Sequence, residues 1–95
     1  METKKNKNYD LIHADPGITL EWQEREKNLI ISGEGTCELG EVRGDIAAEG
    51  HADVTVRAVS GNTWSYDDSR ITAGSVGGGA ATCHTSTITI GGVKI

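Results

Sequence analysis

The sequence predicts an all-β fold, a right-handed parallel β-solenoid (β-helix) of about four to five coils with about 17 residues in each coil. Two observations support this prediction. A Val-x-Gly pattern returns at a constant step, the repeat step, and the same step separates successive pairs of apolar residues. The members of each pair are two positions apart, the spacing of side chains on one face of a strand. The pattern begins at Val42, Val59 and Val76, Val93 lies one step further, and the pairs are Leu20/Trp22, Cys37/Leu39, Val54/Val56, Ile71/Ala73 and Ile88/Ile90.

The residue between the members of each pair is expected to face solvent, because successive side chains of a strand point to opposite faces. Residues at the same place in successive coils are expected to lie about 4.8 Å apart, the spacing between neighbouring strands. We call such a set, with members separated by the repeat step, a stack. The right-handed sense follows from the general preference for right-handed crossovers between parallel strands. The outward residues are Glu21, Glu38, Thr55, Thr72 and Thr89.

Residues 1–8 are predicted to be a disordered basic tail, because they are polar and lack periodicity. Their three lysines outnumber a single glutamate, so the tail carries +2 of the net charge of −5, and the remaining residues carry −7. An acidic body argues against binding to a phosphate backbone, which needs clustered Lys and Arg. We therefore expect no nucleic-acid partner, and a short basic tail alone does not predict a membrane partner.

Residues 9–26 are predicted to form an N-terminal cap together with a first strand. Asp15-Pro16-Gly17 is a turn signature, because proline presets φ and glycine accepts a positive φ. The turn allows the segment around Leu11 to fold over the first coil. Such a cap would cover the backbone groups that the end of a solenoid exposes.

Residues 18–32 are compatible with three structures. Alternating apolar residues favour strands, good helix formers over residues 21–28 favour a helix, and a turn over residues 25–28 would make a hairpin. We favour a strand on each side, because Leu20 and Trp22 belong to the repeated pairs. Residues 29–31 also have the composition of a buried strand.

Residues 27–95 are assigned to the β-solenoid itself. Each coil should have three short sides, which predicts a roughly triangular cross-section. Gly44, Gly61 and Gly78 open three coils at one corner and are expected to relieve the strain of positive φ there. The valines that precede this corner, from Val42 to Val93, should form an aliphatic stack inside. In register, the coils run over residues 27–43, 44–60, 61–77 and 78–94.

The unit Val42-Arg43-Gly44-Asp45-Ile46-Ala47-Ala48-Glu49-Gly50 resembles the coil unit of bactofilins. The resemblance extends over residues 42–95, and residues 1–26 lie outside it. Bactofilins are bacterial cytoskeletal proteins, and the resemblance implies a right-handed triangular β-helix that polymerises end to end without nucleotide. Similar coils occur in bacteriophage spikes and adhesins, so a phage or prophage origin is the alternative.

The cysteines and histidines predict neither a disulfide nor a metal site. Cys37 and Cys83 occupy different places in coils about three apart, roughly 14 Å along the axis at sheet spacing, whereas a disulfide needs Cα atoms within about 7 Å. We expect two reduced thiols, with Cys37 in the core. No metal-ligand spacing, nucleophile with a base, or phosphate loop is present, so we expect no enzyme activity and no cofactor.

The location is predicted to be cytoplasmic, or the virion if the chain is phage-encoded. The sequence contains no apolar run near the roughly 20 residues that span a bilayer. Its N-terminal residues also lack the apolar stretch of a signal peptide. Reduced cysteines fit this location.

Two histidine–aspartate pairs are predicted at one corner of the solenoid. His51 lies one coil from Asp68 in one stack, and Asp67 lies one coil from His84 in another. The members of each pair would be about 5 Å apart at sheet spacing. Corner loops of any solenoid collect Asp, Gly and His as turn residues, so a catalytic or metal-binding role is disfavoured.

The function predicted first is a non-enzymatic, self-assembling scaffold of the bactofilin type that associates through the ends of the β-helix. Residues 87–95 read as one alternating strand with nothing after it. An open apolar edge is a template for another chain. The predicted self-association residues are Ile88, Ile90, Val93 and Ile95.

The alternative function is a phage- or prophage-encoded β-solenoid binding module that acts through protein–protein contacts. Such a module would resemble a spike or an adhesin, or it would bind a host protein. Trp64 and Tyr66 are larger than most other members of their stacks, and aromatic residues dominate binding hot spots. Trp64 can point inward as part of the core or outward as an anchor for a partner. The predicted partner-binding residues are Trp64, Tyr66, Asp67 and Asp68.

Overall fold

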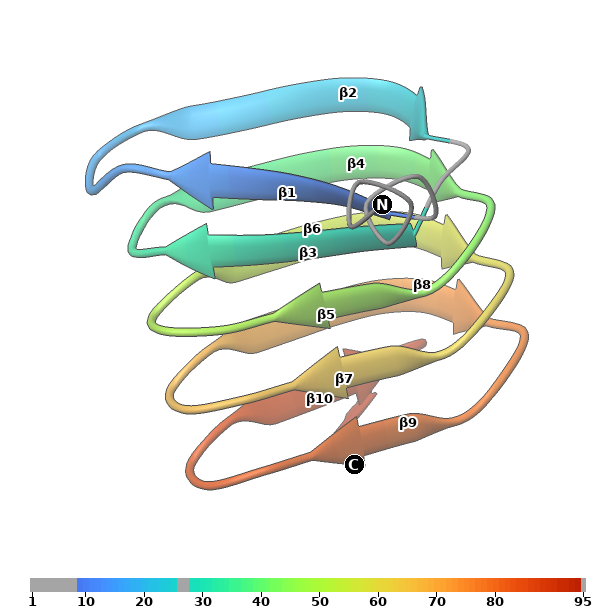
Figure 1. The fold of residues 1–95 in the computed structure, drawn as a ribbon. Coiled ribbons are helices and arrows are strands. Elements are labelled where there is room, and N and C mark those ends of the chain that lie inside the picture. Colours follow the sequence, from blue (N-terminus) through green and yellow to red (C-terminus); the bar gives the residue numbers. More distant parts are fainter. Residues whose placement is uncertain (1–8, 26–27, 95) are drawn as a thin grey trace, which may run out of the picture.

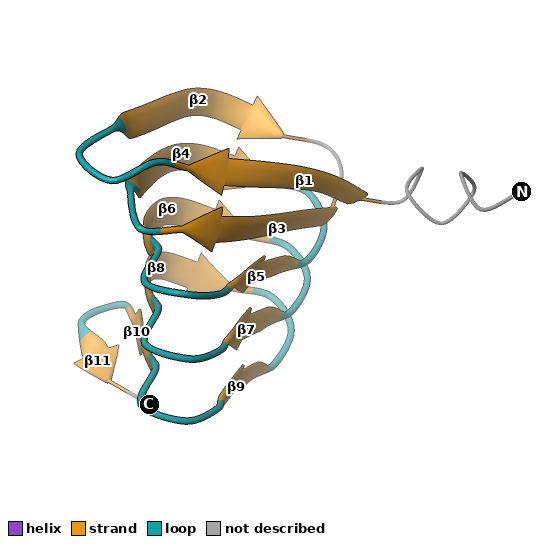
Figure 2. Cartoon of the chain, turned by 60° about the vertical axis from the view of Figure 1, so that its left-hand side comes forward, coloured by secondary structure: helices purple, strands orange, loops and turns teal. Residues whose placement is uncertain are grey.

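The computed structural model describes residues 9–25 and 28–94, and in this part of the chain the fold is all-β. The strands lie in two sheets that face each other across the core (Figures 1 and 2). These residues include no helix long and apolar enough to cross a membrane. The strands are β1 (Tyr9–Ala14), β2 (Thr19–Arg25), β3 (Asn28–Gly33), β4 (Thr36–Val42), β5 (Ile46–Ala48), β6 (Asp53–Val59), β7 (Thr63–Ser65), β8 (Arg70–Val76), β9 (Ala80–Thr82), β10 (Thr87–Ile90) and β11 (Val93–Lys94).

Up to β10 the chain alternates between the two sheets. The five-stranded sheet has the order β1-β3-β5-β7-β9, and the six-stranded sheet has the order β11-β10-β8-β6-β4-β2. Apart from β10 and β11, neighbouring strands are parallel, and Leu39 pairs with Val56, one repeat step further along the chain. The predicted β-solenoid is thus confirmed, with about four turns. In Figure 1 the chain runs left along the near sheet and right along the far sheet as it descends, which is a right-handed path.

The first coil is longer than the others. β1 pairs with β3 so that Tyr9 opposes Asn28, a wider separation along the chain than the repeat step. β2 and β4 keep the repeat step, with Thr19 opposite Thr36. The additional residues lie in the turn between β1 and β2. There the N–H of Ile18 donates a hydrogen bond to the carbonyl of Asp15 over 3.1 Å, and Gly17 has a φ of 80°.

The turn predicted at Asp15-Pro16-Gly17 is therefore present. The hydrogen bond between its first and fourth residues, together with the positive φ of Gly17, makes it a type II turn with Pro16 and Gly17 at its centre.

The segment predicted as a cap, residues 9–26, contributes β1 and β2 to the N-terminal end of the two sheets. Each of these strands has an outer edge that faces no strand of the described chain. β2 pairs with β4, and β3 pairs with β1 and β5. The described part of this segment, residues 18–25 and 28–32, therefore contains the two strands favoured from the sequence, and not a helix or a hairpin.

The core between the sheets consists of stacks of small and aliphatic side chains. Along β6 the inward residues Val54, Val56 and Val59 are spaced by two and then by three positions, because the strand bends at a corner. The pairing of β6 with β8 omits Arg57 and Gly74 and keeps the same register on both sides of them. Two of the three predicted sides therefore belong to one bent sheet, and the structure has two sheets around its core. The stack Cys37, Val54, Ile71 and Ile88 is fully buried, at 0% exposure.

The role predicted for Gly44, Gly61 and Gly78 is wrong, because none of the three has a positive φ. A Cβ on Gly61 would lie 2.8 Å from the carbonyl oxygen of Gly44 and would also collide with the carboxylate of Asp45. Glycine is thus required by the close approach of neighbouring coils. Positive φ values occur instead at another corner, in the stack Gly33, Gly50, Asp67 and His84, with φ of 105°, 70°, 59° and 61°.

The C-terminal end differs from the single strand predicted over residues 87–95. β10 ends at Ile90, Gly91 and Gly92 have φ of 58° and 86°, and β11 returns antiparallel to β10 (Figure 2). Two consecutive positive φ values are typical of a type I′ hairpin turn. Val93 is consequently 68% exposed and lies outside the valine stack, which ends at Val76.

Candidate interaction surface

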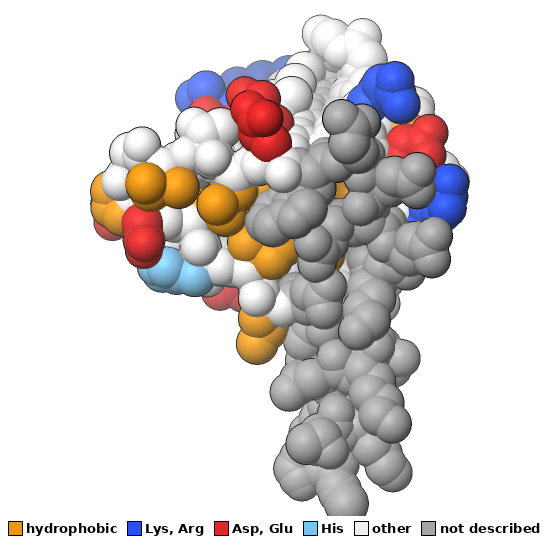
Figure 3. Space-filling model, turned by 90° about the horizontal axis from the view of Figure 1, so that it is seen from above, with side chains coloured by type: hydrophobic (Ala, Val, Ile, Leu, Met, Phe, Trp, Pro, Cys, Tyr) orange, Lys and Arg blue, Asp and Glu red, His pale blue; other side chains and the backbone are white. Residues whose placement is uncertain are grey.

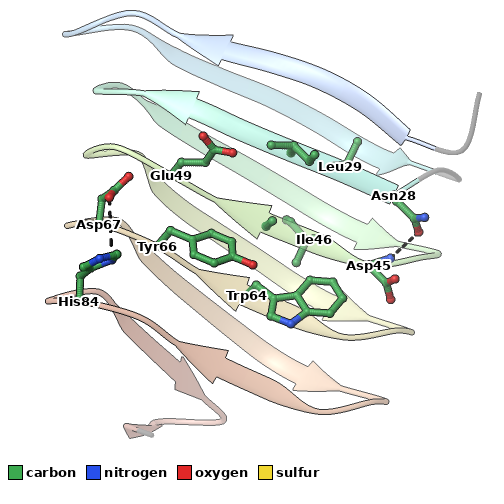
Figure 4. Close-up of a pocket in the computed structure, with 11 residues that line it drawn as sticks. Asn28, Leu29, Asp45, Ile46, Glu49, Trp64, Tyr66, Asp67 and His84 are labelled. Carbon is green, nitrogen blue, oxygen red and sulfur yellow. Dashed lines mark hydrogen bonds and ion pairs between the residues drawn. The ribbon is translucent and has the colours of Figure 1, made fainter. Parts of the chain in front are cut away.

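Trp64 and Tyr66 both face away from the core. The neighbours of Trp64 in β7, Thr63 and Ser65, are fully buried, so alternation places Trp64 on the outer face of the five-stranded sheet. Tyr66 is 37% exposed. Figure 4 shows both rings on this outer face. The outward alternative for Trp64 is therefore the correct one.

The two rings line a groove of about 650 Å³ on the outer face of the five-stranded sheet (Figure 4). This volume lies within the range of ligand pockets in proteins. Ile30 from β3, Ala47 from β5 and Trp64 from β7 contribute apolar surface to the groove. Its acidic residues are Asp45, Glu49 and Asp67.

The apolar part of the groove belongs to a stripe that runs along the solenoid axis. Leu11, Ile30, Ala47, Trp64 and Ala81 occupy paired positions on the five successive strands of the sheet. Leu11 is 67% exposed, and the other members are half-buried or exposed. Figure 3, seen from the N-terminal end, shows hydrophobic side chains at the surface beside acidic side chains and a histidine. A contiguous apolar stripe on the outside of a protein indicates an interaction surface.

Two of the three carboxylates in the groove are engaged with the chain itself. Asp45 accepts the backbone N–H of Asn62 over 2.8 Å. Asp67 accepts a backbone N–H of the preceding coil over 3.2 Å and lies 3.9 Å from Nδ1 of His84. The side chain of Glu49 is half-buried and makes no hydrogen bond or ion pair with a described residue. Glu49 is therefore available to a binding partner.

Both predicted histidine–aspartate pairs form at the corner that follows the five-stranded sheet. Nδ1 of His51 is 3.6 Å from Asp68, which also accepts a hydrogen bond from the hydroxyl of Thr85. Asp67 and His84 hold the left-handed φ values of this corner, which Asp and His tolerate better than most residues. Asp67 and His84 line the groove, whereas Asp68 does not. The pairs therefore connect successive corner loops, and one of them borders the groove.

The predicted position of Cys37 in the core is confirmed, because this residue is fully buried. Cys83 is exposed, and no disulfide joins the two cysteines. In the part of the chain that the structure describes, no group of three His, Cys, Asp or Glu side chains is placed to hold a metal ion. The hydroxyl groups of Ser65 and Ser69 are also buried. Their oxygens lie 2.7 Å apart and share a hydrogen bond, so these serines are part of the core and not a reactive site.

The predicted self-association residues do not form one exposed edge. Ile88 is fully buried, Ile90 packs against the core, and Val93 is exposed. Ile95 lies outside the described residues. β11 also pairs with part of the β10 edge that was predicted to be open, because Ile90 opposes Val93.

The sequence interpretation missed Ile30 and Glu49 as residues of the surface. Each shares a stack with an aromatic residue that was singled out, Ile30 with Trp64 and Glu49 with Tyr66. The repeat step would have identified both once the outward direction of Trp64 was known.

Comparisons with known proteins identify no relative. No family model matches the chain, and no curated protein or solved structure matches it significantly. The β-solenoid fold and its exposed apolar stripe suggest a protein-interaction or structural role.

Proposed function

We propose that this chain is a non-enzymatic protein-interaction module that binds a partner protein through the groove on its five-stranded sheet. The outward position of Trp64 and Tyr66 in a groove of about 650 Å³ supports the proposal most strongly. Large aromatic side chains contribute much of the binding free energy at protein interfaces. The proposal applies to a cellular chain and to a phage-encoded chain alike.

The groove is built on rigid elements, which favours specific binding. β7, which carries Trp64 at its centre, pairs with β5 on one side and β9 on the other. The adjacent side chains of Thr63 and Ser65 are anchored in the core. Side chains on paired strands are held more precisely than those on loops, and a preformed site loses less conformational entropy on binding.

Photo-cross-linking in the cells that produce the protein tests this function. The photoreactive residue p-benzoylphenylalanine replaces either Ala81, which is exposed one coil from Trp64, or Thr72, which is exposed on the six-stranded sheet. We expect a discrete adduct with another protein from position 81 and none from position 72. The adduct should disappear when Trp64→Ala is added. No adduct from either position, or equal adducts from both, would exclude the groove as the binding surface.

A second candidate function is self-assembly into a scaffold of the bactofilin type through the ends of the solenoid. β1 and β2 at one end and β9 at the other have edges that face no described strand. Unpaired strand edges are templates for a further strand. β11 argues against this candidate, because it pairs with part of the β10 edge that the next copy would need.

A further inference from the structure

The charge of the groove indicates the chemistry of its partner, and this inference rests on the function proposed above. The described residues that line the groove include three carboxylates and neither lysine nor arginine. His84 also lines the groove, and its Nδ1 lies 3.9 Å from the carboxylate of Asp67. Complementary charge selects partners at interfaces, and juxtaposed like charges exclude them. The groove therefore favours a cationic group and disfavours an anionic one.

Glu49 is the carboxylate best placed to receive that cation. Its backbone N–H donates to the carbonyl of Ile31 over 2.9 Å, so its main chain is fixed to the neighbouring coil. Its side chain is half-buried and without a hydrogen-bond or ion-pair partner in the described chain. A partly desolvated carboxylate without a partner is costly, and a bound cation would offset that cost.

The aromatic rings favour a planar cation over a compact one. Tyr66 lies in the same stack as Glu49, and Figure 4 shows its ring below that carboxylate, with Trp64 beside it. A guanidinium group stacks on aromatic rings and donates two parallel N–H bonds to a carboxylate. A lysine ammonium is a strongly hydrated point charge, so it cannot combine a planar stack on a ring with two parallel N–H bonds to a carboxylate.

We propose that the groove binds an arginine side chain of the partner protein. Its guanidinium stacks on Tyr66 and donates hydrogen bonds to Glu49. Aliphatic residues next to that arginine lie on the apolar stripe, against Ile30 and Ala47. The partner is thus a protein segment that presents arginine beside aliphatic residues.

Nuclear magnetic resonance titration with two small probes tests the arginine contact. One probe is N-acetyl-arginine methylamide, and the other is N-acetyl-citrulline methylamide, which has nearly the same shape without the charge. With ¹⁵N-labelled protein, the arginine probe should shift the amide resonances of Glu49 and Tyr66 and the indole resonance of Trp64. The citrulline probe should shift them much less at equal concentration.

Two variants localise the contact. Glu49→Gln keeps the shape of the side chain and removes its charge, and it should weaken binding of the arginine probe about five-fold, because a charge-assisted hydrogen bond is lost. Glu38→Gln is the matched control, since Glu38 is exposed on the outer face of the six-stranded sheet. That variant should bind the probe as the unmodified chain does.

Equal shifts with the arginine and citrulline probes would overturn the inference. Unchanged binding of the arginine probe in Glu49→Gln would overturn it as well. Either result leaves the proposed function to the cross-linking experiment, which does not depend on the charge of the partner. If position 81 gives an adduct but the arginine probe causes no resonance shifts, the protein is still an interaction module, and arginine is not its ligand.

Discussion

The carboxylate of Asp45 accepts a hydrogen bond from the backbone N–H of Asn62, one coil further along the solenoid, over 2.8 Å. Asn28 makes the same contact to the N–H of Asp45 over 2.8 Å, and Asn62 makes it to the N–H of Gly79 over 2.7 Å. These three side chains form one stack at the corner where β3 begins and which directly precedes β5 and β7. The stack supplies side-chain oxygens that accept hydrogen bonds from backbone N–H groups at a corner where the strands are interrupted.

Asn62→Ala should lower the free energy of unfolding by about 1 kcal/mol, because the N–H of Gly79 loses its acceptor. Urea denaturation measures this difference. The slope of the unfolding free energy against urea concentration should be the same for the variant and the unmodified chain. Ser60→Ala, an exposed change two residues away, is the control and should have little effect. Equal stability of the two variants would show that the stack does not contribute.

Gly61→Ala should destabilise the fold by about 2 kcal/mol, since the added Cβ would press against Asp45 and the backbone of Gly44. Gly79→Ala is the matched control, because its Cβ would approach only Asn62, at 3.8 Å. Thermal unfolding followed by circular dichroism compares the two. A Gly61→Ala variant as stable as Gly79→Ala would refute the close approach of the coils.

Thr63→Val should raise the free energy of unfolding by about 1 kcal/mol. The hydroxyl of Thr63 is fully buried and has no hydrogen-bond partner among the described residues. Its stack neighbours Ile46 and Ala80 are apolar, and valine has nearly the same shape as threonine. Thr55→Val, on the exposed face of β6, should change stability little. A loss of stability in Thr63→Val would show that the hydroxyl is satisfied in solution.

Removal of residues 93–95 should promote self-association, because it deletes β11 and exposes the edge of β10. Analytical ultracentrifugation at several concentrations measures the effect against the full chain. Val93→Thr is the control, since it keeps the hairpin and reduces only the exposed apolar area. If the truncated chain sediments as the full chain does, β11 does not protect the edge.

The fold was predictable because stacking forces each coil to repeat its inward positions. The constant repeat step correctly indicated the pairing of Leu39 with Val56 and of Val54 with Ile71. The same step gave a wrong prediction at Val93. This residue lies one repeat step after Val76, yet it is exposed and is not part of the valine stack. The pair Gly91-Gly92 is a hairpin signal, and this local turn overrides the repeat.

The candidate site was harder to predict, because the composition of β7 does not distinguish its two faces. Thr63 and Ser65 are polar and point inward, whereas Trp64 is apolar and points outward. An isolated three-residue strand with this composition favours the opposite orientation. Only the stacking of Thr63 on Ile46 and of Ser65 on Ala48 determines which face is buried. The two histidine–aspartate pairs, in contrast, were predicted correctly from the repeat step alone.

Light scattering on a size-exclusion column over a wide concentration range tests most directly whether this solenoid is an interaction module or a self-assembling scaffold. We predict one particle mass that does not change with concentration, because β11 pairs with part of the β10 edge and the groove lies on a sheet face, not at a coil end. A mass that grows continuously with concentration, with filaments in the same fractions, would show end-to-end assembly and refute the interaction module.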